Sequence, residues 1–305
     1  MKIEVSKKHT FNGHKDAIFC LANGIDSNIF YSAGGEGFLV KWDIENPESG
    51  IVVAKVNNSV YATAFLKEQN QMLVGQNFEG VHLIDLYSNK EIQSLQITKS
   101  AIFDIKTFKN IAFIACGDGE VVWLDIEKNI ILNKIKISAK SARCIAINHL
   151  LNEVCVGYSD YFIRVYDLNR GILKTEWLAH KNSVFSLDFS PDFKYLLSTG
   201  RDAQIKIWDC WEQYSFIDSI AAHLYAVNNL SFQAKNDLFA TASIDKTVKI
   251  WSGLDFKLLK VIDKSRYLGH SSSANKLLWL SANQLLSAGD DKVINLWEIK
   301  KIIDY

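Results

Sequence analysis

Three residue types that can carry out acyl transfer stand at a fixed spacing in this chain. A hydroxyl, an imidazole and a carboxylate are the groups of a nucleophilic triad, in which the imidazole takes the proton of the attacking hydroxyl. Such a set, followed by a tryptophan, occurs in four places: His14, Ser32, Glu36 and Trp42; His180, Ser198, Asp202 and Trp208; His223, Thr241, Asp245 and Trp251; His270, Ser287, Asp291 and Trp297. Four copies of one triad in a single chain make no chemical sense. We therefore predict a repeated structural role for them, and no catalytic residue.

The tryptophan ends a unit that repeats along the chain. The stretch STGRDAQIKIWD (198–209) has three close copies, AGGEGFLVKWD, ASIDKTVKIWS and AGDDKVINLWE, and three weaker ones, EGVHLID, GDGEVVWLD and SDYFIRVYD. The repeats end 40 to 46 residues apart, near Trp42, Ile84, Leu124, Tyr166, Trp208, Trp251 and Trp297. A period of about 40–45 residues that ends in Trp-Asp is typical of one four-stranded propeller blade.

These repeats resemble the WD40-repeat family, closely in four repeats and in degenerate form in three, over nearly the whole chain. The resemblance implies an all-β fold, a seven-bladed β-propeller of four-stranded antiparallel blades. Short apolar runs predict the strands within a repeat, for example 183–189, 195–199 and 204–208 in the fifth. Residues 1–305 are expected to form a single domain, because repeat units cannot bury their faces alone.

The two ends of the chain predict how the ring closes. Residues 3–9 occupy the place of an outermost strand, yet no blade precedes the first repeat. The last repeat has only the eight residues EIKKIIDY after Trp297, which are too few for a turn and a full outer strand. We expect residues 2–10 to pair onto the seventh blade. This removes two open sheet edges and agrees with the closure of WD40 propellers.

The resemblance also implies a role for the repeated His, Ser or Thr, Asp and Trp positions. In the WD40 family they form a buried network in which Asp accepts from His, His reaches the hydroxyl, and the hydroxyl meets the Trp N–H. The degenerate repeats carry apolar or aromatic residues at the hydroxyl and Trp positions: Val74, Ile114 and Val156, and Ile84, Leu124 and Tyr166. Losing one member would strand the others, so we expect Asp202→Ala to lower stability and not activity.

One position on the inner strand, five residues past the His position, suggests where a partner binds. Across the seven repeats it holds Phe19, Tyr61, Phe103, Arg143, Phe185, Asn228 and Asn275. The resemblance places this position at the rim of the central opening, on the usual partner-binding face of the family. Four aromatic residues and an arginine match the types enriched at binding hot spots. The alternative is that the aromatic rings only plug the mouth of the channel.

A second ring of residues comes from the turn just before the Asp position. It holds Gly35, Asn77, Gly117, Ser159, Arg201, Ile244 and Asp290. Its charged members, Arg201 and Asp290, are expected to project on the same face. Together with Arg143, Arg201 predicts a basic spot for an acidic peptide, a phosphate or a carboxylate. The alternative is a set of turn residues that are merely solvated.

Composition narrows the classes of partner. The chain has 34 basic and 34 acidic residues, whereas nucleic-acid binding proteins usually carry a basic excess, so a nucleic-acid partner is not expected. Neither a signal peptide nor a membrane-spanning stretch is recognised. Five scattered cysteines indicate reduced, mostly buried thiols and a cytoplasmic protein. A P-loop, an HExxH motif and paired cysteine ligands are missing from the sequence, so we expect neither a cofactor nor a metal.

The sequence therefore predicts a non-catalytic scaffold, monomeric by default, that binds an unidentified protein or peptide on the rim of the opening. One alternative is a small ligand or a nucleic acid in the same opening. Another is a propeller enzyme, a hydrolase or lyase, whose site would gather carboxylates, histidines or a metal at the channel mouth. Whether the degenerate second to fourth repeats form another binding surface is left open.

Overall fold

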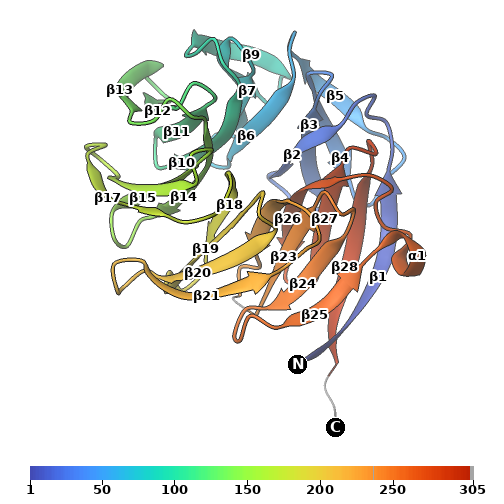
Figure 1. Cartoon of the computed structure of the whole chain (residues 1–305). Coiled ribbons are helices and arrows are strands. Elements are labelled where there is room, and N and C mark those ends of the chain that lie inside the picture. Colours follow the sequence, from blue (N-terminus) through green and yellow to red (C-terminus); the bar gives the residue numbers. More distant parts are fainter. Residues whose placement is uncertain (236, 303–305) are drawn as a thin grey trace.

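A computed structural model of the protein describes residues 1–235 and 237–302. These residues form 28 strands and one short helix, and the strands assemble into seven four-stranded antiparallel sheets arranged in a ring (Figure 1). We call each sheet a blade and number the blades one to seven in the order of their first strands. The predicted all-β, seven-bladed propeller is confirmed.

Six blades are built from four consecutive strands, and the seventh takes its fourth strand from the beginning of the chain. Blade one comprises β2 (Ile18–Asn23), β3 (Ile29–Gly34), β4 (Phe38–Asp43) and β5 (Ile51–Lys55). Blade two comprises β6 (Val60–Leu66), β7 (Gln71–Gln76), β8 (Gly80–Asp85) and β9 (Lys90–Gln96). Blade three comprises β10 (Ile102–Phe108), β11 (Ile111–Cys116), β12 (Glu120–Asp125) and β13 (Ile130–Lys136). Blade four comprises β14 (Ala142–Asn148), β15 (Glu153–Tyr158), β16 (Phe162–Asp167) and β17 (Leu173–Leu178). Blade five comprises β18 (Val184–Phe189), β19 (Tyr195–Gly200), β20 (Gln204–Asp209) and β21 (Ser215–Ala221). Blade six comprises β22 (Val227–Phe232), β23 (Leu238–Ser243), β24 (Val248–Ser252) and β25 (Leu258–Ile262). Blade seven comprises β26 (Ala274–Ser281), β27 (Gln284–Gly289), β28 (Ile294–Ile302) and β1 (Lys2–Phe11).

The core of the protein lies between neighbouring blades. Along β6, the sequence VYATAFL alternates between buried and half-buried residues, and its alanines and Leu66 join an apolar cluster shared by blades two and three. Each of the seven pairs of neighbouring blades has such a cluster. Because both faces of a blade are covered, second strands such as β15 and β23 are buried at every position. The outermost strand β21 is exposed at all but one position.

The first strands of the seven blades surround the centre of the ring. Each of them contacts the first strands of the two neighbouring blades, and β2 of blade one closes this inner circle against β26 of blade seven. Their starting ends are therefore brought together at one mouth of the central opening, although the seven strands are spread over the whole sequence.

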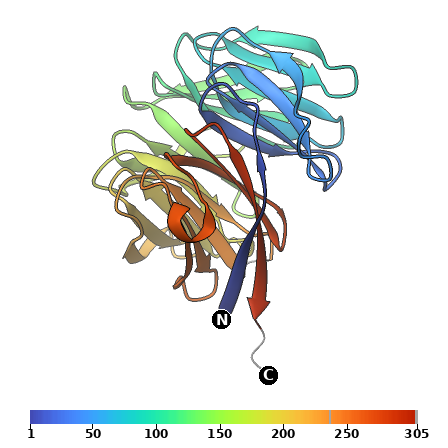
Figure 2. The same cartoon turned by 90° about the vertical axis from the view of Figure 1, so that its right-hand side faces the viewer.

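The ring closes through the two ends of the chain, as predicted. β1 pairs antiparallel with β28, from Lys2 opposite Ile302 to Phe11 opposite Ile294, and Figure 2 shows the two strands running side by side. The observed strand includes Phe11, whose ring packs edge-on against Phe30 of blade one at a centroid distance of 4.9 Å. β1 thus joins the last blade by hydrogen bonds and the first blade by apolar contact. Residues 303–305, part of the expected domain, lie outside the described residues.

The helix α1 (Lys264–Tyr267) lies in the loop between β25 and β26, and Asp263 caps it by accepting a hydrogen bond from the backbone N–H of Arg266. It is the single helix of the described residues, in keeping with a chain that is nearly all β. Among the same residues, no helix combines the length and the apolar character needed to cross a membrane.

Candidate functional site

The seven predicted rim positions share an irregularity of the backbone. In blade three, Ile102 pairs with Cys116 and Asp104 pairs with Ala115, so Phe103 is an extra, unpaired residue in the first strand. The same shift occurs at the rim position of every blade. Such β-bulges change the direction of a side chain and end regular pairing. Each rim residue is therefore aimed by a bulge at the start of an innermost strand.

Five of these residues form a continuous arc across blades one to five. The ring of Phe19 meets Tyr61 edge-on at a centroid distance of 4.7 Å, and Tyr61 is parallel to Phe103 at 6.0 Å. The Arg143 guanidinium then lies over Phe103 at 3.9 Å and over Phe185 at 4.9 Å from the ring centroids. All five side chains are half-buried. They present part of their surface to the opening while their neighbours hold their orientation.

Amide side chains complete the ring on blades six and seven. Asn228 Nδ2 donates to Ser273 Oγ at 2.9 Å and to the Ala274 carbonyl at 3.0 Å. Asn275 Nδ2 donates to Asp290 Oδ1 at 2.6 Å and to the Ile18 carbonyl of blade one at 3.2 Å. These bonds tie neighbouring blades together at the mouth. The asparagine side chains of the rim are consequently used in hydrogen bonds within the protein to a greater degree than the aromatic side chains are.

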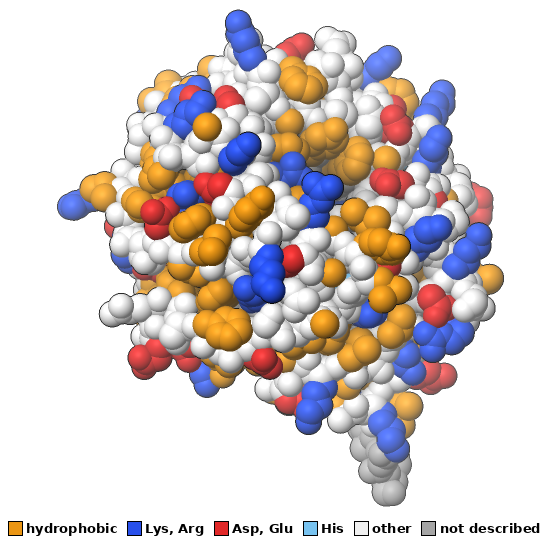
Figure 3. Space-filling view, viewed as in Figure 1, with side chains coloured by type: hydrophobic (Ala, Val, Ile, Leu, Met, Phe, Trp, Pro, Cys, Tyr) orange, Lys and Arg blue, Asp and Glu red, His pale blue; other side chains and the backbone are white. Residues whose placement is uncertain are grey.

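The rim encloses a cavity of about 670 Å³ at the mouth of the central opening. Figure 3 shows the corresponding hollow near the middle of the face, with hydrophobic and Lys or Arg side chains around it. A space of this size is within the range of sites that receive a small molecule or a few residues of a peptide. The aromatic rings therefore do not fill the mouth completely.

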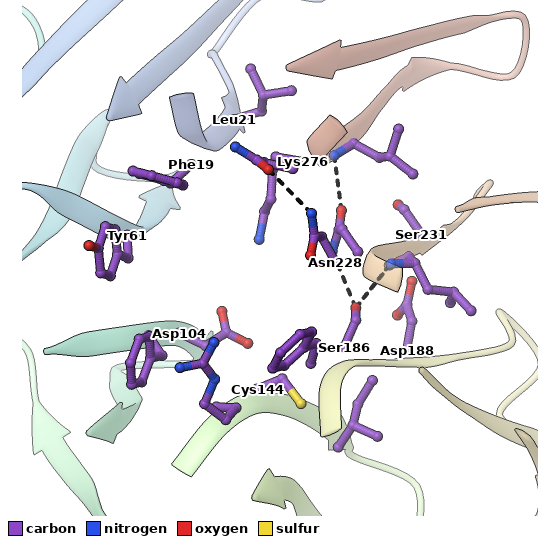
Figure 4. A pocket seen from close by; sticks show the side chains of 18 of the residues that line it. Phe19, Leu21, Tyr61, Asp104, Cys144, Ser186, Asp188, Asn228, Ser231 and Lys276 are labelled. Carbon is purple, nitrogen blue, oxygen red and sulfur yellow. Dashed lines mark hydrogen bonds between the residues drawn. The ribbon is translucent and has the colours of Figure 1, made fainter. Parts of the chain in front are cut away.

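Charged side chains that are not among the predicted site residues line the wall of this cavity. They are Asp104 and Lys106 of blade three, Asp188 of blade five and Lys276 of blade seven. Figure 4 shows Asp104 and Lys276 pointing into the opening from different blades. These residues follow the bulge on the innermost strands, so they lie outside the rim positions that were compared across the repeats.

Asp104 and Asp188 connect neighbouring blades. Asp104 Oδ2 accepts a hydrogen bond from the Ile145 N–H of blade four at 2.8 Å, and Asp188 Oδ2 accepts from the Phe232 N–H of blade six at 2.9 Å. Innermost strands have one unpaired edge, and its N–H groups need acceptors when they are buried. The two carboxylates supply such acceptors, so part of their hydrogen-bonding capacity is used by the fold.

The electrostatics of the wall follow from burial and proximity. Burial raises the pKa of Asp188 to about 6, against the opposing effects of the Phe232 N–H and Lys106. Asp104 raises the pKa of Lys106, and the effect exceeds the opposing influence of burial. Burial lowers the pKa of Arg143, although a guanidinium stays protonated at pH 7. At neutral pH the opening thus contains fixed charges of both signs.

The second ring of turn residues does not act as one set. Ile244 and Asp290 line the cavity, whereas Arg201 is exposed and does not line it. Asn77 is fully buried, accepts from the Ile102 N–H at 2.8 Å and donates to Ser59 Oγ at 2.9 Å. Neither a partner-binding ring nor a set of solvated turn residues describes Asn77, whose side chain joins blades two and three. Arg201 and Arg143 do not share the wall of the cavity, so the predicted basic spot has no support from the lining.

An apolar loop beside the opening was also missed. Leu224 and Tyr225, between β21 and β22, are 85% and 63% exposed, and Ile244 in the neighbouring turn is 45% exposed. The Ile244 N–H donates to the Ala226 carbonyl at 3.1 Å, which holds the turn against the loop. The three side chains make an apolar shelf on blade six. Its sequence signal was the Leu-Tyr pair after His223, where the other three networks have polar or charged residues.

The repeated His, hydroxyl, acid and Trp residues lie within hydrogen-bonding distance in all four strong blades. In blade five, His180 Nδ1 is 2.9 Å from Asp202 Oδ1, and His180 Nε2 is 2.8 Å from Ser198 Oγ. Trp208 Nε1 donates to the same hydroxyl oxygen at 2.9 Å. With the imidazole neutral and protonated on Nδ1, every donor in the set has an acceptor. The corresponding contacts in blades one, six and seven are 2.6–2.9 Å long.

Burial and hydrogen bonding make these sets unsuited to nucleophilic catalysis. The His180 side chain is 0% exposed, and Ser198 is 0% exposed. Burial raises the pKa of Asp202, but its interaction with His180 and the hydrogen bonds from the backbone N–H groups of Lys181 and Gln204 outweigh this effect, and the pKa is lowered overall. The hydroxyl is enclosed between an imidazole and an indole, so a substrate has no path to it. We propose that the sets brace their blades.

Blade one shows what glutamate does in the acid position. Glu36 Oε1 lies 2.6 Å from His14 Nδ1 and accepts from the Lys15 N–H at 3.2 Å, while Oε2 is buried without a partner among the described residues. In blade one a single carboxylate oxygen therefore makes both contacts, whereas in blade five both oxygens of Asp202 contact His180. The longer side chain keeps the network and leaves one acceptor unsatisfied.

The degenerate blades replace the network by different means. The residues at the hydroxyl position, Val74, Ile114 and Val156, are all buried. In blade four the Tyr166 hydroxyl lies 2.7 Å from the Tyr158 hydroxyl, so one of the two donates a hydrogen bond to the other. In blade three, Trp123 Nε1 donates to the Leu168 carbonyl of blade four at 2.9 Å.

Other candidate chemistry is confined to isolated groups. His82 Nδ1 lies 2.9 Å from Glu91 Oε2 on the outer part of blade two. Within residues 1–235 and 237–302, no group of three or more His, Cys, Asp or Glu side chains is placed to hold a metal ion. The five cysteines are free and buried, and burial raises the pKa of Cys20 and Cys116 to about 12.

Comparison with known proteins places these observations in a family context. Residues 5–43, 171–209, 214–252 and 262–298, about half of the chain, match the WD40 family described as "WD domain, G-beta repeat". These four stretches contain the four complete networks. Blades two and three and the first three strands of blade four, which lack such a network, fall outside the matched residues.

Whole-chain relatives are distant. The chain is 24% identical over 304 residues to actin-interacting protein 1 of Drosophila melanogaster, in an alignment covering 95% of the chain and 47% of the relative. It is 23% identical over 303 residues to the 66 kDa stress protein of Physarum polycephalum, covering 95% and 48%. WD repeat-containing protein 1-B of Xenopus laevis is 24% identical over 298 residues, covering 94% and 47%. The chain spans about half the length of these curated relatives.

Proposed function

Because this chain belongs to the WD40 family, we propose that it is a non-catalytic interaction module that binds a protein or peptide at the mouth of its central opening. The observation that carries the proposal is the arc of half-buried residues from Phe19 to Phe185 around a cavity of about 670 Å³. Aromatic side chains and arginine are enriched at binding hot spots, and rigid aromatic rings bury a large area at a low entropic cost.

Two features of the arc favour binding over a purely structural plug. The five side chains keep part of their surface accessible, and they border a space that a partner can enter. The core of each blade interface is already supplied by its own apolar cluster. The rim aromatics are thus additional to the residues that hold neighbouring blades together.

The experiment is affinity capture from a native lysate with mass spectrometry, using wild type and the double variant Tyr61→Ala/Phe185→Ala. The matched control is Tyr87→Ala/Phe216→Ala, which removes the same two residue types from exposed positions outside the cavity lining. We expect one or a few proteins that bind wild type and the control but not the rim variant. Circular dichroism and thermal melts establish that the variants are folded.

Other outcomes would contradict the proposal. If the same proteins are captured by all three chains, the rim is not the binding surface. If none is captured, a small ligand, a nucleic acid or an enzymatic substrate becomes the better occupant of the opening. Screening metabolites and oligonucleotides for a shift in melting temperature distinguishes these alternatives.

Actin is the first defined protein to test. The relative from Drosophila melanogaster is named actin-interacting protein 1, but it is about twice as long as the matched region. We propose purified actin as a candidate partner and the cytoplasm as the location, the latter because five free, buried thiols suit a reducing compartment. Co-sedimentation of the chain with actin filaments, with the rim variant in parallel, tests the candidate.

A further inference from the structure

Two cations in the opening have hydrogen-bonding capacity that the fold does not use. Among the described residues, neither Arg143 nor Lys276 donates a side-chain hydrogen bond or forms an ion pair. Arg143 is clamped between the rings of Phe103 and Phe185, which fixes the plane of the guanidinium and leaves its N–H donors available. The Lys276 ammonium enters the cavity from blade seven (Figure 4).

The carboxylates of the same cavity are in a different condition. Asp104 accepts from two backbone N–H groups, those of Ile105 at 3.0 Å and Ile145 at 2.8 Å. Asp188 accepts from the Phe232 N–H, and Asp290 accepts from Asn275 Nδ2. Each acid is thus partly satisfied within the protein, and Asp104 and Asp188 also compensate the charge of Lys106. Among the charged groups of the wall, the hydrogen-bonding capacity that stays unused therefore belongs mainly to the donors, Arg143 and Lys276.

An apolar surface lies next to these cations. Leu224, Tyr225 and Ile244 form the shelf of blade six, and Ile244 also lines the cavity. The loop before β22 and the rim bulges all lie at the starting ends of the innermost strands, so the shelf and Arg143 share one face of the ring. Three large apolar side chains that stay exposed beside a cavity mark an interaction surface.

Building on the function proposed above, we propose that the partner segment is an acidic peptide whose carboxylate enters the opening and is bound by Arg143 and Lys276. A large apolar residue of the same segment packs on the shelf of Leu224, Tyr225 and Ile244. A guanidinium held in one plane recognises a carboxylate through two parallel hydrogen bonds, which are stronger than bonds between neutral groups. The flanking Phe103 and Phe185 rings shield the pair from water.

The test begins with an unbiased probe, a phage-displayed library of random 12-residue peptides selected on the full chain. We expect selected peptides to contain Asp or Glu within a few residues of a large apolar residue. A selected peptide is then labelled with fluorescein, and its affinity is measured by anisotropy beside a counterpart in which the acid is replaced by Gln or Asn. The replacement is expected to weaken binding about tenfold or more.

Variants of the chain locate the carboxylate. Arg143→Gln and Lys276→Gln are each expected to weaken the acidic peptide about tenfold and to leave the amide counterpart nearly unchanged. The matched control is Arg170→Gln/Lys67→Gln, which removes exposed charges of the same two types away from the cavity. Leu224→Ser/Tyr225→Ser tests the shelf and should weaken both peptides.

Each outcome decides the question. Selection of peptides without acidic residues overturns the inference, as does equal loss of both peptides in Arg143→Gln. If such neutral peptides still fail to bind Tyr61→Ala/Phe185→Ala, the proposed function survives and only the acidic specificity is wrong. If selected peptides bind the rim variant normally, both proposals fall. A preference for a phosphorylated counterpart over the carboxylate would also overturn the assignment of the anion.

Discussion

Removing the carboxylate of Asp202 tests the bracing role of the buried networks. In the folded chain this carboxylate receives hydrogen bonds from His180 Nδ1 at 2.9 Å and from the Lys181 N–H at 3.0 Å. After Asp202→Ala, water can reach the Lys181 N–H because that residue is exposed, whereas the His180 side chain is 0% exposed. A stranded buried donor costs about 1–3 kcal/mol, and bonds to a charged acceptor lie at the upper end.

We therefore expect Asp202→Ala to lower the free energy of unfolding by about 2–3 kcal/mol. For a domain of this size that corresponds to a fall of roughly 4–6 °C in melting temperature. Urea denaturation followed by tryptophan fluorescence measures the loss. Asp218→Ala is the control, because it makes the same substitution at an exposed position of β21 in the same blade.

The pH dependence of this loss adds a second constraint. The pKa of Asp202 is lowered in the folded chain, so its contribution is present above the ordinary Asp pKa near 3.9 and is lost as the pH falls through the lowered value. The difference between wild type and Asp202→Ala should narrow in strongly acidic solution. Equal unfolding free energies for the two chains at pH 7 would refute the bracing role.

Three further predictions follow from particular side chains. Glu36→Asp is expected to raise the free energy of unfolding by up to about 1 kcal/mol in denaturant titrations, because an aspartate can contact the histidine through both oxygens, as Asp202 does, whereas Glu36 leaves Oε2 buried without a partner among the described residues; a loss would show that the longer side chain is needed. The pKa of Asp188 is raised to about 6, so the folded chain binds a proton at this carboxyl more tightly than the unfolded chain does. The stabilisation that this proton provides is fully present below about pH 4 and is lost as the pH rises through 6. Asp188→Asn should therefore gain stability relative to wild type between pH 4 and 8, by at most about 3 kcal/mol, and a difference that is independent of pH would contradict the shift. Because burial raises the pKa of Cys20 and Cys116 to about 12, the native chain should not react with Ellman's reagent at pH 8, and unfolding should expose all five thiols; rapid reaction of the folded chain would disagree with the burial.

The fold could be predicted because its signal is repeated. Seven anchors at a regular period predict seven blades even where Ile84 and Leu124 replace tryptophan, because the apolar strand pattern persists without the network. The short segment after Trp297 and the strand-like segment before His14 predict the closure of the ring. Each of these inferences compares one repeat with another and needs no knowledge of side-chain direction.

The wall of the opening was harder to predict. On a regular strand, alternate residues face opposite sides, but the bulge at Phe103 shifts this alternation by one residue. The direction of the Asp104 and Lys106 side chains can be inferred from the sequence only when the position of the bulge is known. Asn77 was misjudged for a related reason, because its position in a turn suggests exposure, whereas its amide joins two blades.

The most direct test of the central claim is hydrogen–deuterium exchange of the wild-type chain with and without the protein recovered by capture. If the partner binds at the mouth of the opening, exchange should slow in the loops that lead into β14, β18 and β22 and at the starts of these strands. The outermost strands β9 and β13 should be unaffected. Protection confined to those outer strands, with unchanged exchange around Arg143 and Phe185, would contradict the account.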